Sequence, residues 1–144
     1  MRILIDTNVV LDVLQENEPA FTHGKDIFLA AANKRIEGFI TAKEVADIHF
    51  FARKQFKGQD NVDEKARQVL AGLFVLFDII DTLGSDCQNA LGISNGDYED
   101  AIMIAAAMRS KMDAIVTSDK RHFRKSPVLV YTPSEFVSRF LTSC

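Results

Sequence analysis

Short apolar runs alternate along the chain with longer stretches in which apolar residues recur every three or four positions. The runs predict five strands, over 3–5, 38–40, 75–80, 114–116 and 128–131. The periodic stretches predict helices over 8–15, 21–33, 42–56, 60–74, 85–91, 97–111 and 133–141. Strands that alternate with helices predict one α/β domain with a mainly parallel central sheet.

Capping residues mark several of these helix starts. Asp60 or Asn61 is expected to cap the fourth helix and Ser85 the fifth, while residues 132–135 read as a capping box with proline at the first helical position. Residues 92–96 are expected to form a loop. Residues 101–108 are almost wholly apolar, which predicts a central, buried helix.

Composition agrees with a single folded domain. The 144 residues are 47% hydrophobic and 26% charged, so one domain over residues 1–144 is expected. No run of about 18 apolar residues is present, which predicts no membrane span. The first 14 residues do not read as a secretory signal, and Cys87 and Cys144 are expected to be free thiols, so we expect a cytoplasmic protein.

Acidic residues gather where the predicted strands end. Asp6 and Asp119 follow the first and fourth strands, Glu44 lies in the first turn after the second, and Asp97 and Asp100 share one face at the start of the apolar helix. Ligands of open α/β sheets bind at this carboxyl edge. Each acid alone could be a helix cap or a first-turn residue that favours the helix dipole. Capping does not explain why acids follow the central strands at one edge.

Grouped carboxylates repel one another, and a divalent cation removes that penalty. Mg²⁺ takes oxygen ligands and can activate a water for attack on a phosphodiester, and two ions about 4 Å apart would suit an in-line displacement. Asn8 could support an acid or a water, or cap the following helix. Thr117 and Ser118 could orient Asp119 or satisfy backbone groups.

The chain resembles the PIN-domain nucleases over nearly its whole length. The resemblance lies in five segments, which hold these acids in order: 3–10, 41–45, 97–107, 115–123 and 131–136. The resemblance implies a three-layer α/β/α sandwich and a ribonuclease that depends on Mg²⁺ or Mn²⁺. It implies four catalytic acids that also bind the metal, namely Asp6, Glu44, Asp100 and Asp119. Asp97 would be a fifth metal ligand. Many small bacterial members are VapC-type toxins of toxin–antitoxin pairs and are usually homodimers, which implies RNA as substrate and an antitoxin as partner. His122 stands where many members have a further acid.

The formal net charge of −3 at first argues against a nucleic-acid partner. Setting the five candidate ligands aside leaves 15 acidic residues against 17 basic ones. Seven basic residues near the predicted site are candidates for RNA binding: Arg53, Lys54, Lys57, Lys120, Arg121, Arg124 and Lys125. A solvated surface would explain these residues equally well. This distribution predicts weak, salt-sensitive RNA binding.

Two other functions are open at this point. The chain could be a PIN-like module that binds RNA without cutting it, or a haloacid-dehalogenase-like phosphatase, whose nucleophile needs a second Asp where this chain has Asn8. His49 lies about 140° around its helix from Glu44 and is expected to be structural. His122 could contact a phosphate or lie on a surface loop.

Overall fold

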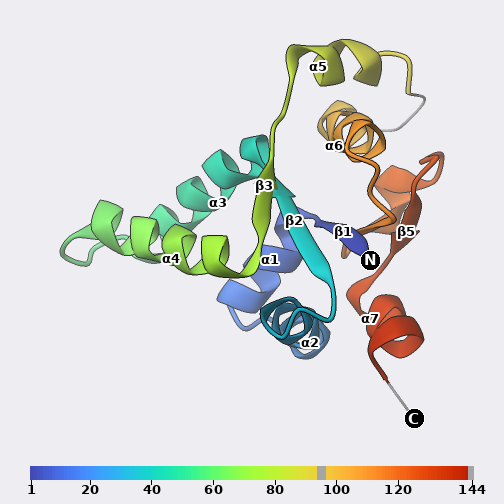
Figure 1. Cartoon of the computed structure of the whole chain (residues 1–144). Helices are drawn as coiled ribbons and strands as arrows, with labels where there is room; N and C mark the ends of the chain where they lie inside the picture. Colours follow the sequence, from blue (N-terminus) through green and yellow to red (C-terminus); the bar gives the residue numbers. More distant parts are fainter. Residues whose placement is uncertain (94–96, 143–144) are drawn as a thin grey trace.

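The computed structural model describes residues 1–93 and 97–142. Its five strands form one sheet in the order β3-β2-β1-β4-β5, and every neighbouring pair is parallel (Figure 1). The strands are β1 (Arg2–Ile5), β2 (Glu37–Thr41), β3 (Asp78–Ile80), β4 (Ala114–Val116) and β5 (Leu129–Tyr131). The parallel sheet expected from the sequence is confirmed.

Helices connect the strands throughout. The α-helices are α1 (Thr7–Leu14), α2 (Ala20–Ala32), α3 (Ala42–Gln55), α4 (Val62–Leu76), α5 (Gly84–Ala90), α6 (Tyr98–Arg109) and α7 (Pro133–Phe136). A 3₁₀ turn, η1 (Lys120–Phe123), follows β4, and a π-helical turn, η2 (Val137–Leu141), continues α7. The predicted last helix therefore exists but changes its hydrogen-bonding pattern after Phe136.

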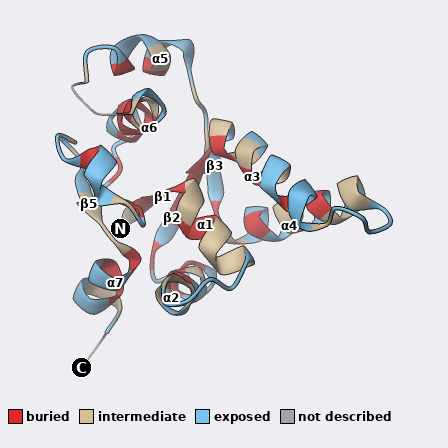
Figure 2. Ribbon diagram, turned by 180° about the vertical axis from the view of Figure 1, so that it is seen from behind, coloured by how far each residue is buried: buried red, intermediate tan, exposed pale blue. Residues whose placement is uncertain are grey.

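The central strand β1 separates two apolar cores. Ile3 and Ile5 point to the face covered by α1, α2, α3, α4 and α7, whereas Leu4 points to the opposite face, where it packs with Ile104 of α6. Both cores are visible as buried segments on either side of the sheet (Figure 2). These two helical layers around the sheet confirm the three-layer α/β/α sandwich. Helix α6 is buried along most of its length, as its apolar sequence predicts.

The predicted strand over 75–80 is wrong in its first part. Helix α4 extends to Leu76, and only residues 78–80 form β3. Val75 is 84% exposed on the helix, while Phe77 turns into an extended conformation and buries its ring. A short apolar run does not reveal which of its residues face the core, so the sequence could not separate the helix end from the strand.

Two predicted caps are also corrected. Asn61 precedes α4 in a left-handed conformation without a side-chain capping bond. Helix α5 starts before Ser85, because Asp86 accepts a hydrogen bond from the backbone N–H of Leu83 and thereby sets the N-terminus. Of the predicted loop at 92–96, Gly92 and Ile93 form a turn, and residues 94–96 lie outside the described residues.

Across the described ranges, no helix has the length and apolar character that a membrane crossing requires. Cys87 is a free, partly buried thiol, and Cys144 lies outside the described residues.

Candidate functional site

A cavity of about 580 Å³ opens at the carboxyl edge of the sheet, between α1, α3, α6 and η1. All five acids singled out from the sequence line it: Asp6, Glu44, Asp97, Asp100 and Asp119. They come from four separate segments of the chain, and the parallel sheet brings these segments together because its carboxyl ends share one edge.

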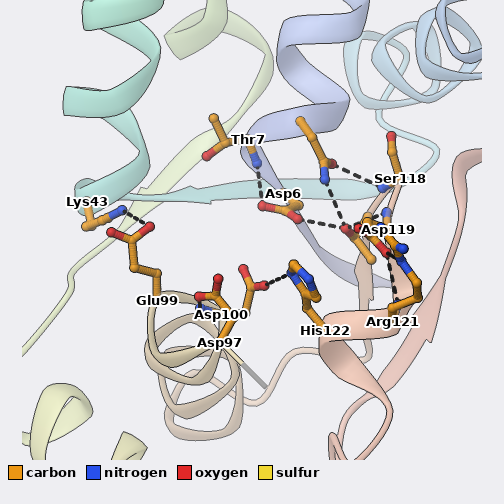
Figure 3. A network of polar contacts seen from close by, with 12 residues as sticks. Asp6, Thr7, Lys43, Asp97, Glu99, Asp100, Ser118, Asp119, Arg121 and His122 are labelled. Carbon is orange, nitrogen blue, oxygen red and sulfur yellow. Dashed lines mark hydrogen bonds and ion pairs between the residues drawn. The ribbon is translucent and has the colours of Figure 1, made fainter. Parts of the chain in front are cut away.

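Asp6 lies at the centre of this cavity and is held in place by both of its oxygens. Oδ1 accepts a hydrogen bond of 2.7 Å from the backbone N–H of Thr7, which makes Asp6 the N-cap of α1, and Oδ2 accepts one of 2.7 Å from the hydroxyl of Thr117 (Figure 3). The residue is only 8% exposed. Burial raises the pKa of Asp6 despite these hydrogen bonds.

Glu44 is the most deeply buried of the five acids, at 1% exposed. It forms a capping box with Thr41, whose backbone N–H donates to Oε1 over 2.9 Å, and the hydroxyl of Thr7 donates to Oε2 over 3.2 Å. Burial, followed by repulsion from Asp6, raises the pKa of Glu44 well above its ordinary value. A cation in the cavity would relieve both effects.

Asp97 and Asp100 occupy the first turn of α6. Asp97 is the N-cap, since its Oδ1 accepts a hydrogen bond of 3.1 Å from the backbone N–H of Asp100. Burial, with repulsion from Asp6 and Asp97, raises the pKa of Asp100 to about 6. Asp97 thus has the capping role that the sequence left open as an alternative to metal binding, and the cap leaves it on the wall of the same cavity.

Asp119 is bound by the guanidinium of a neighbouring residue. The guanidinium of Arg121 donates to both oxygens of Asp119, over 2.9 and 2.8 Å. These hydrogen bonds hold the pKa of Asp119 well below its usual range. Asp119 is therefore ionised, and each of its oxygens accepts one hydrogen bond from the guanidinium of Arg121.

Of the three supporting residues, Thr117 contacts Asp6, whereas the hydroxyl of Ser118 donates to Asp12 over 3.1 Å. The hydroxyl of Thr117 donates to Asp6 and accepts from the backbone N–H of Asp119, so it positions the first acid more directly than the fourth. Asn8 accepts from the backbone N–H of Ser118 over 3.1 Å and tethers α1 to the end of β4. The capping role considered for Asn8 is wrong, because Asp6 provides the cap.

Two of the basic candidates pair with acids outside the cavity, Arg53 with Asp63 and Lys120 with Glu135. The ammonium of Lys54 lies over the ring of Phe50, which lines the cavity. Within the described part of the chain, none of the seven lines the acidic cavity, although Lys120, Arg121 and Arg124 line a second hollow of about 440 Å³ that shares Phe123 with it. Lys57 is exposed beyond the end of α3, and Lys125 is exposed after η1. A basic surface thus adjoins the acid cluster on its η1 side.

A family model described as PIN domain matches residues 2–121, most of the chain. The chain belongs to the PIN domain family. Its fold is also that of solved VapC-type toxins. No curated protein sequence matches the chain.

Three solved structures illustrate this likeness. The toxin–antitoxin complex from Klebsiella pneumoniae is 18% identical, with a TM-score of 0.67 over 91% of this chain and 97% of that one. DNA-bound VapBC from Salmonella typhimurium is 17% identical, with a TM-score of 0.68 over 92% and 98%. The sarcin-ricin loop cleaving toxin from Mycobacterium tuberculosis is 10% identical, with a TM-score of 0.62 over 84% and 92%. At these identities the likeness shows a shared fold.

Thr7 and Lys43 line the PIN-domain cavity but have no role in the predictions from sequence, which considered His122 as a phosphate contact or a surface-loop residue. Thr7 links Asp6 to Glu44, and its position directly after Asp6 was the available signal. Lys43 reaches from α3 toward the first turn of α6, where its ammonium lies 3.4 Å from a carboxylate oxygen of Glu99. His122 lines the cavity, and its Nδ1 lies 3.0 Å from Oδ2 of Asp100 (Figure 3). By contrast, His49 contacts Asp63, as its predicted structural role requires.

The donors in this cavity suit a divalent cation. Carboxylate oxygens are the ligands that Mg²⁺ and Mn²⁺ accept, and burial has already raised the pKa of three of the carboxyls. Donor atoms of Asp97, Asp100 and His122 lie within 4.8 Å of one another. The PIN-domain site therefore contains carboxylates that a cation would stabilise, and donor atoms that are close enough to bind the same ion.

Proposed function

We propose that this PIN domain is a metal-dependent endoribonuclease that hydrolyses phosphodiester bonds of RNA. The observation that supports the proposal most strongly is the convergence of five carboxylates, from four segments, on one cavity at the carboxyl edge of the sheet. Three carboxyls with raised pKa values destabilise the folded protein when they are ionised, unless a bound ligand compensates their charge. A divalent cation is a ligand of matching charge and chemistry.

Asp6, Glu44, Asp97, Asp100 and Asp119 are the proposed holders of Mg²⁺ or Mn²⁺. When bound, such an ion supplies a water of lowered pKa and neutralises charge on the phosphate. The other cavity residues act on the carboxylates: Thr7 and Thr117 hold the oxygens of Asp6 in fixed positions. The proposed catalytic acids are Asp6, Glu44, Asp100 and Asp119.

Arg121 has a second proposed role. It lies at the border of the acidic cavity and the basic hollow lined by Lys120 and Arg124. A guanidinium that leaves Asp119 would be placed to meet an RNA phosphate, since Arg binds phosphate as well as carboxylate through the same fork of donors. The basic residues after Asp119 are therefore better candidates for RNA contact than those of α3, because Lys120, Arg121 and Arg124 line the hollow that adjoins the cavity.

The proposal extends to a toxin role with an antitoxin partner and a homodimeric assembly in the cytoplasm. It rests on the shared fold with the Klebsiella pneumoniae toxin–antitoxin complex and Salmonella typhimurium VapBC. Co-expression with the product of a neighbouring small open reading frame tests this role. A stable complex that blocks RNA cleavage supports it, and free, unaffected nuclease contradicts it.

The phosphatase alternative lacks a required group. A haloacid-dehalogenase-like enzyme needs a carboxylate two residues after its nucleophile, and here Asn8 is engaged with Ser118 and Thr117. The alternative of a module that binds RNA without cutting it differs from the proposal only in activity, so the cleavage test decides between them.

Cleavage of a mixed RNA pool by the purified chain tests the proposal. We expect cleavage with Mn²⁺ or Mg²⁺ and loss of cleavage in EDTA. Asp6→Asn should lower the cleavage rate at least about 100-fold, because removing one charge weakens metal binding and the orientation of the bound metal. Asp60→Asn is the matched control, since Asp60 is exposed in the turn before α4. RNA binding without metal-dependent cleavage would instead favour the non-catalytic module.

A further inference from the structure

His122 is positioned in the cavity by the turn that follows Asp119. Residues 120–123 form the 3₁₀ turn η1, whose N-cap is Asp119. A 3₁₀ helix has three residues per turn, so the side chain at i+3 returns to the side of residue i. His122 therefore faces the acid cluster, although 46% of its side chain is exposed.

The ring nitrogen that faces the cluster is Nδ1. It lies 3.0 Å from Oδ2 of Asp100, and a carboxylate oxygen of Asp97 lies within 4.8 Å of both donors (Figure 3). Two neighbouring ligands of an octahedral ion, each about 2.1 Å from the metal, lie about 3 Å apart. The spacing of Nδ1 and Oδ2 therefore equals that of two adjacent ligands of one ion.

We propose that His122 is a nitrogen ligand of the metal, and that this site consequently prefers Mn²⁺ to Mg²⁺. The inference rests on the proposed metal-dependent function and deepens it by naming the ion. Imidazole is a better ligand for transition metals, whereas Mg²⁺ favours oxygen and retains its waters. The carboxylates of Asp97 and Asp100 at the same site suit Mn²⁺, which accepts both oxygen and nitrogen donors.

The competing role for His122 is proton transfer. In that case Nδ1 would donate to Asp100 permanently, and Nε2 would exchange a proton with water or substrate. The structure favours ligation because Nδ1 is grouped with two carboxylates, whereas a proton-transfer pair requires only one. The two roles make opposite predictions about whether a bound metal contacts the ring.

Pulsed electron paramagnetic resonance of Mn²⁺ bound to the full chain tests the contact directly. The chain has three histidines, so labelling histidine with ¹⁵N limits the nitrogen signal to His23, His49 and His122. We expect a directly coordinated ¹⁵N signal that is lost in His122→Asn and retained in His49→Asn. His49 is the matched control because it contacts Asp63, away from the cavity.

Calorimetric titration tests the metal preference. At about pH 8, where imidazole is neutral, we expect Mn²⁺ to bind more tightly than Mg²⁺, and His122→Asn to weaken Mn²⁺ binding about tenfold or more with a smaller effect on Mg²⁺. His122→Asp should shift the preference toward Mg²⁺. Thermal denaturation of each variant checks that the exposed substitution has not unfolded the chain.

Each outcome has one interpretation. Bound Mn²⁺ without a histidine nitrogen signal overturns the ligand role while leaving the proposed nuclease intact, and a pH–rate profile that changes in His122→Asn would then assign proton transfer. An Mn²⁺-to-Mg²⁺ affinity ratio that is unchanged in His122→Asn also overturns it. No binding of either ion to the wild-type chain overturns both the inference and the proposed function.

Discussion

Glu44 is a carboxylate whose surroundings favour its neutral form. Its oxygens accept hydrogen bonds from Thr41 and Thr7, yet burial and the charge of Asp6 outweigh them and raise its pKa. In the absence of metal, an ionised Glu44 therefore destabilises the folded state. This cost at a single residue is what a functional site would impose on an otherwise well-packed domain.

The substitution Glu44→Gln should consequently stabilise the metal-free protein. Gln keeps the shape and an acceptor for Thr41, and removes the buried charge, so we expect unfolding to require about 1 kcal/mol more at neutral pH, or a Tm a few degrees higher. Thermal denaturation in EDTA measures this effect. Added Mn²⁺ should then raise the Tm of the wild type more than that of Glu44→Gln, and an equal rise in both would contradict a ligand role for Glu44.

Asp100 gives a pH dependence with a definite sign. Its pKa is about 6 in the folded state against an ordinary value of 3.8, so between these values the folded protein holds a proton that the unfolded chain has lost. The contribution of Asp100 to the free energy of unfolding is fully present below about pH 4 and is lost as the pH rises through 6. After allowance for solvent screening, we expect a loss of about 2 kcal/mol.

Chemical denaturation in EDTA across this pH range, with wild type and Asp100→Asn, isolates that contribution. The difference in unfolding free energy between the two proteins should change in favour of Asp100→Asn as the pH rises. A difference that stays constant would show that Asp100 titrates normally in the folded state.

At the scale of elements, the contact between β2 and the end of α4 depends on a missing side chain. A Cβ at Gly38 would lie 2.5 Å from the ring of Phe77, which is buried. Gly72 lies within α4 with nothing near its Cβ position. The same substitution at these two glycines should therefore have opposite effects.

We expect Gly38→Ala to destabilise the protein by about 2 kcal/mol through overpacking, and Gly72→Ala to stabilise it by about 0.5–1 kcal/mol because alanine is the better helix former. Urea denaturation of the two variants provides the comparison. Tolerance of Gly38→Ala without loss of stability would mean that Phe77 can move away from β2.

An ion pair between buried Asp86 and partly exposed Arg109 joins helices α5 and α6. The guanidinium of Arg109 donates to both oxygens of Asp86 over 2.9 and 3.0 Å, and Asp86 is fully buried. Burial alone would raise the pKa of Asp86, but the hydrogen bonds from Arg109 and the Leu83 backbone lower it below its usual value. The pair therefore stabilises the fold above the ordinary pKa of Asp and is lost as the pH falls through the lower, folded-state value.

Arg109→Met should destabilise the protein by about 3 kcal/mol at neutral pH, since it leaves the buried Asp86 carboxylate without its cation. The double substitution Asp86→Asn with Arg109→Met should recover part of that loss. Equilibrium unfolding of the single and double variants measures both effects, and a single variant as stable as the wild type would show that Asp86 reaches water.

The sequence predicted the elements better than the contacts between them. Apolar periodicity located β1, β2, β4 and the buried helix α6 because each has a continuous or regular pattern. It failed at Val75 and Phe77, where a single apolar run passes from helix to strand. The pair of Asp86 and Arg109 could not be predicted, because neither residue lies in a pattern that points to the other.

At the site, the five acids could be predicted because a parallel sheet places strand ends together. The ion pairs that individual acids form could not be predicted. Arg121 neutralises Asp119, while Asp100 has His122 beside it, and both contacts depend on the 3₁₀ turn η1 that the sequence pattern did not reveal. The RNA-binding residues remain predictions of the sequence, with those after Asp119 better placed than those of α3.

At the scale of the whole molecule, charge is distributed unevenly over the surface. A formal net charge of −3 combines an acidic cavity at the sheet edge with a basic hollow beside it. The acidic part would bind the cation and the basic part the phosphate backbone. The central claim is that these two parts act together only when the metal is present.

RNA cleavage before and after metal removal tests this claim most directly. The chain is stripped with EDTA, freed of chelator, and returned to Mn²⁺ beside Asp6→Asn treated in the same way. We expect the wild type to lose cleavage on stripping and to regain it with Mn²⁺, while Asp6→Asn stays inactive with an intact fold by circular dichroism. Undiminished cleavage by the stripped protein, or by Asp6→Asn, would contradict the account.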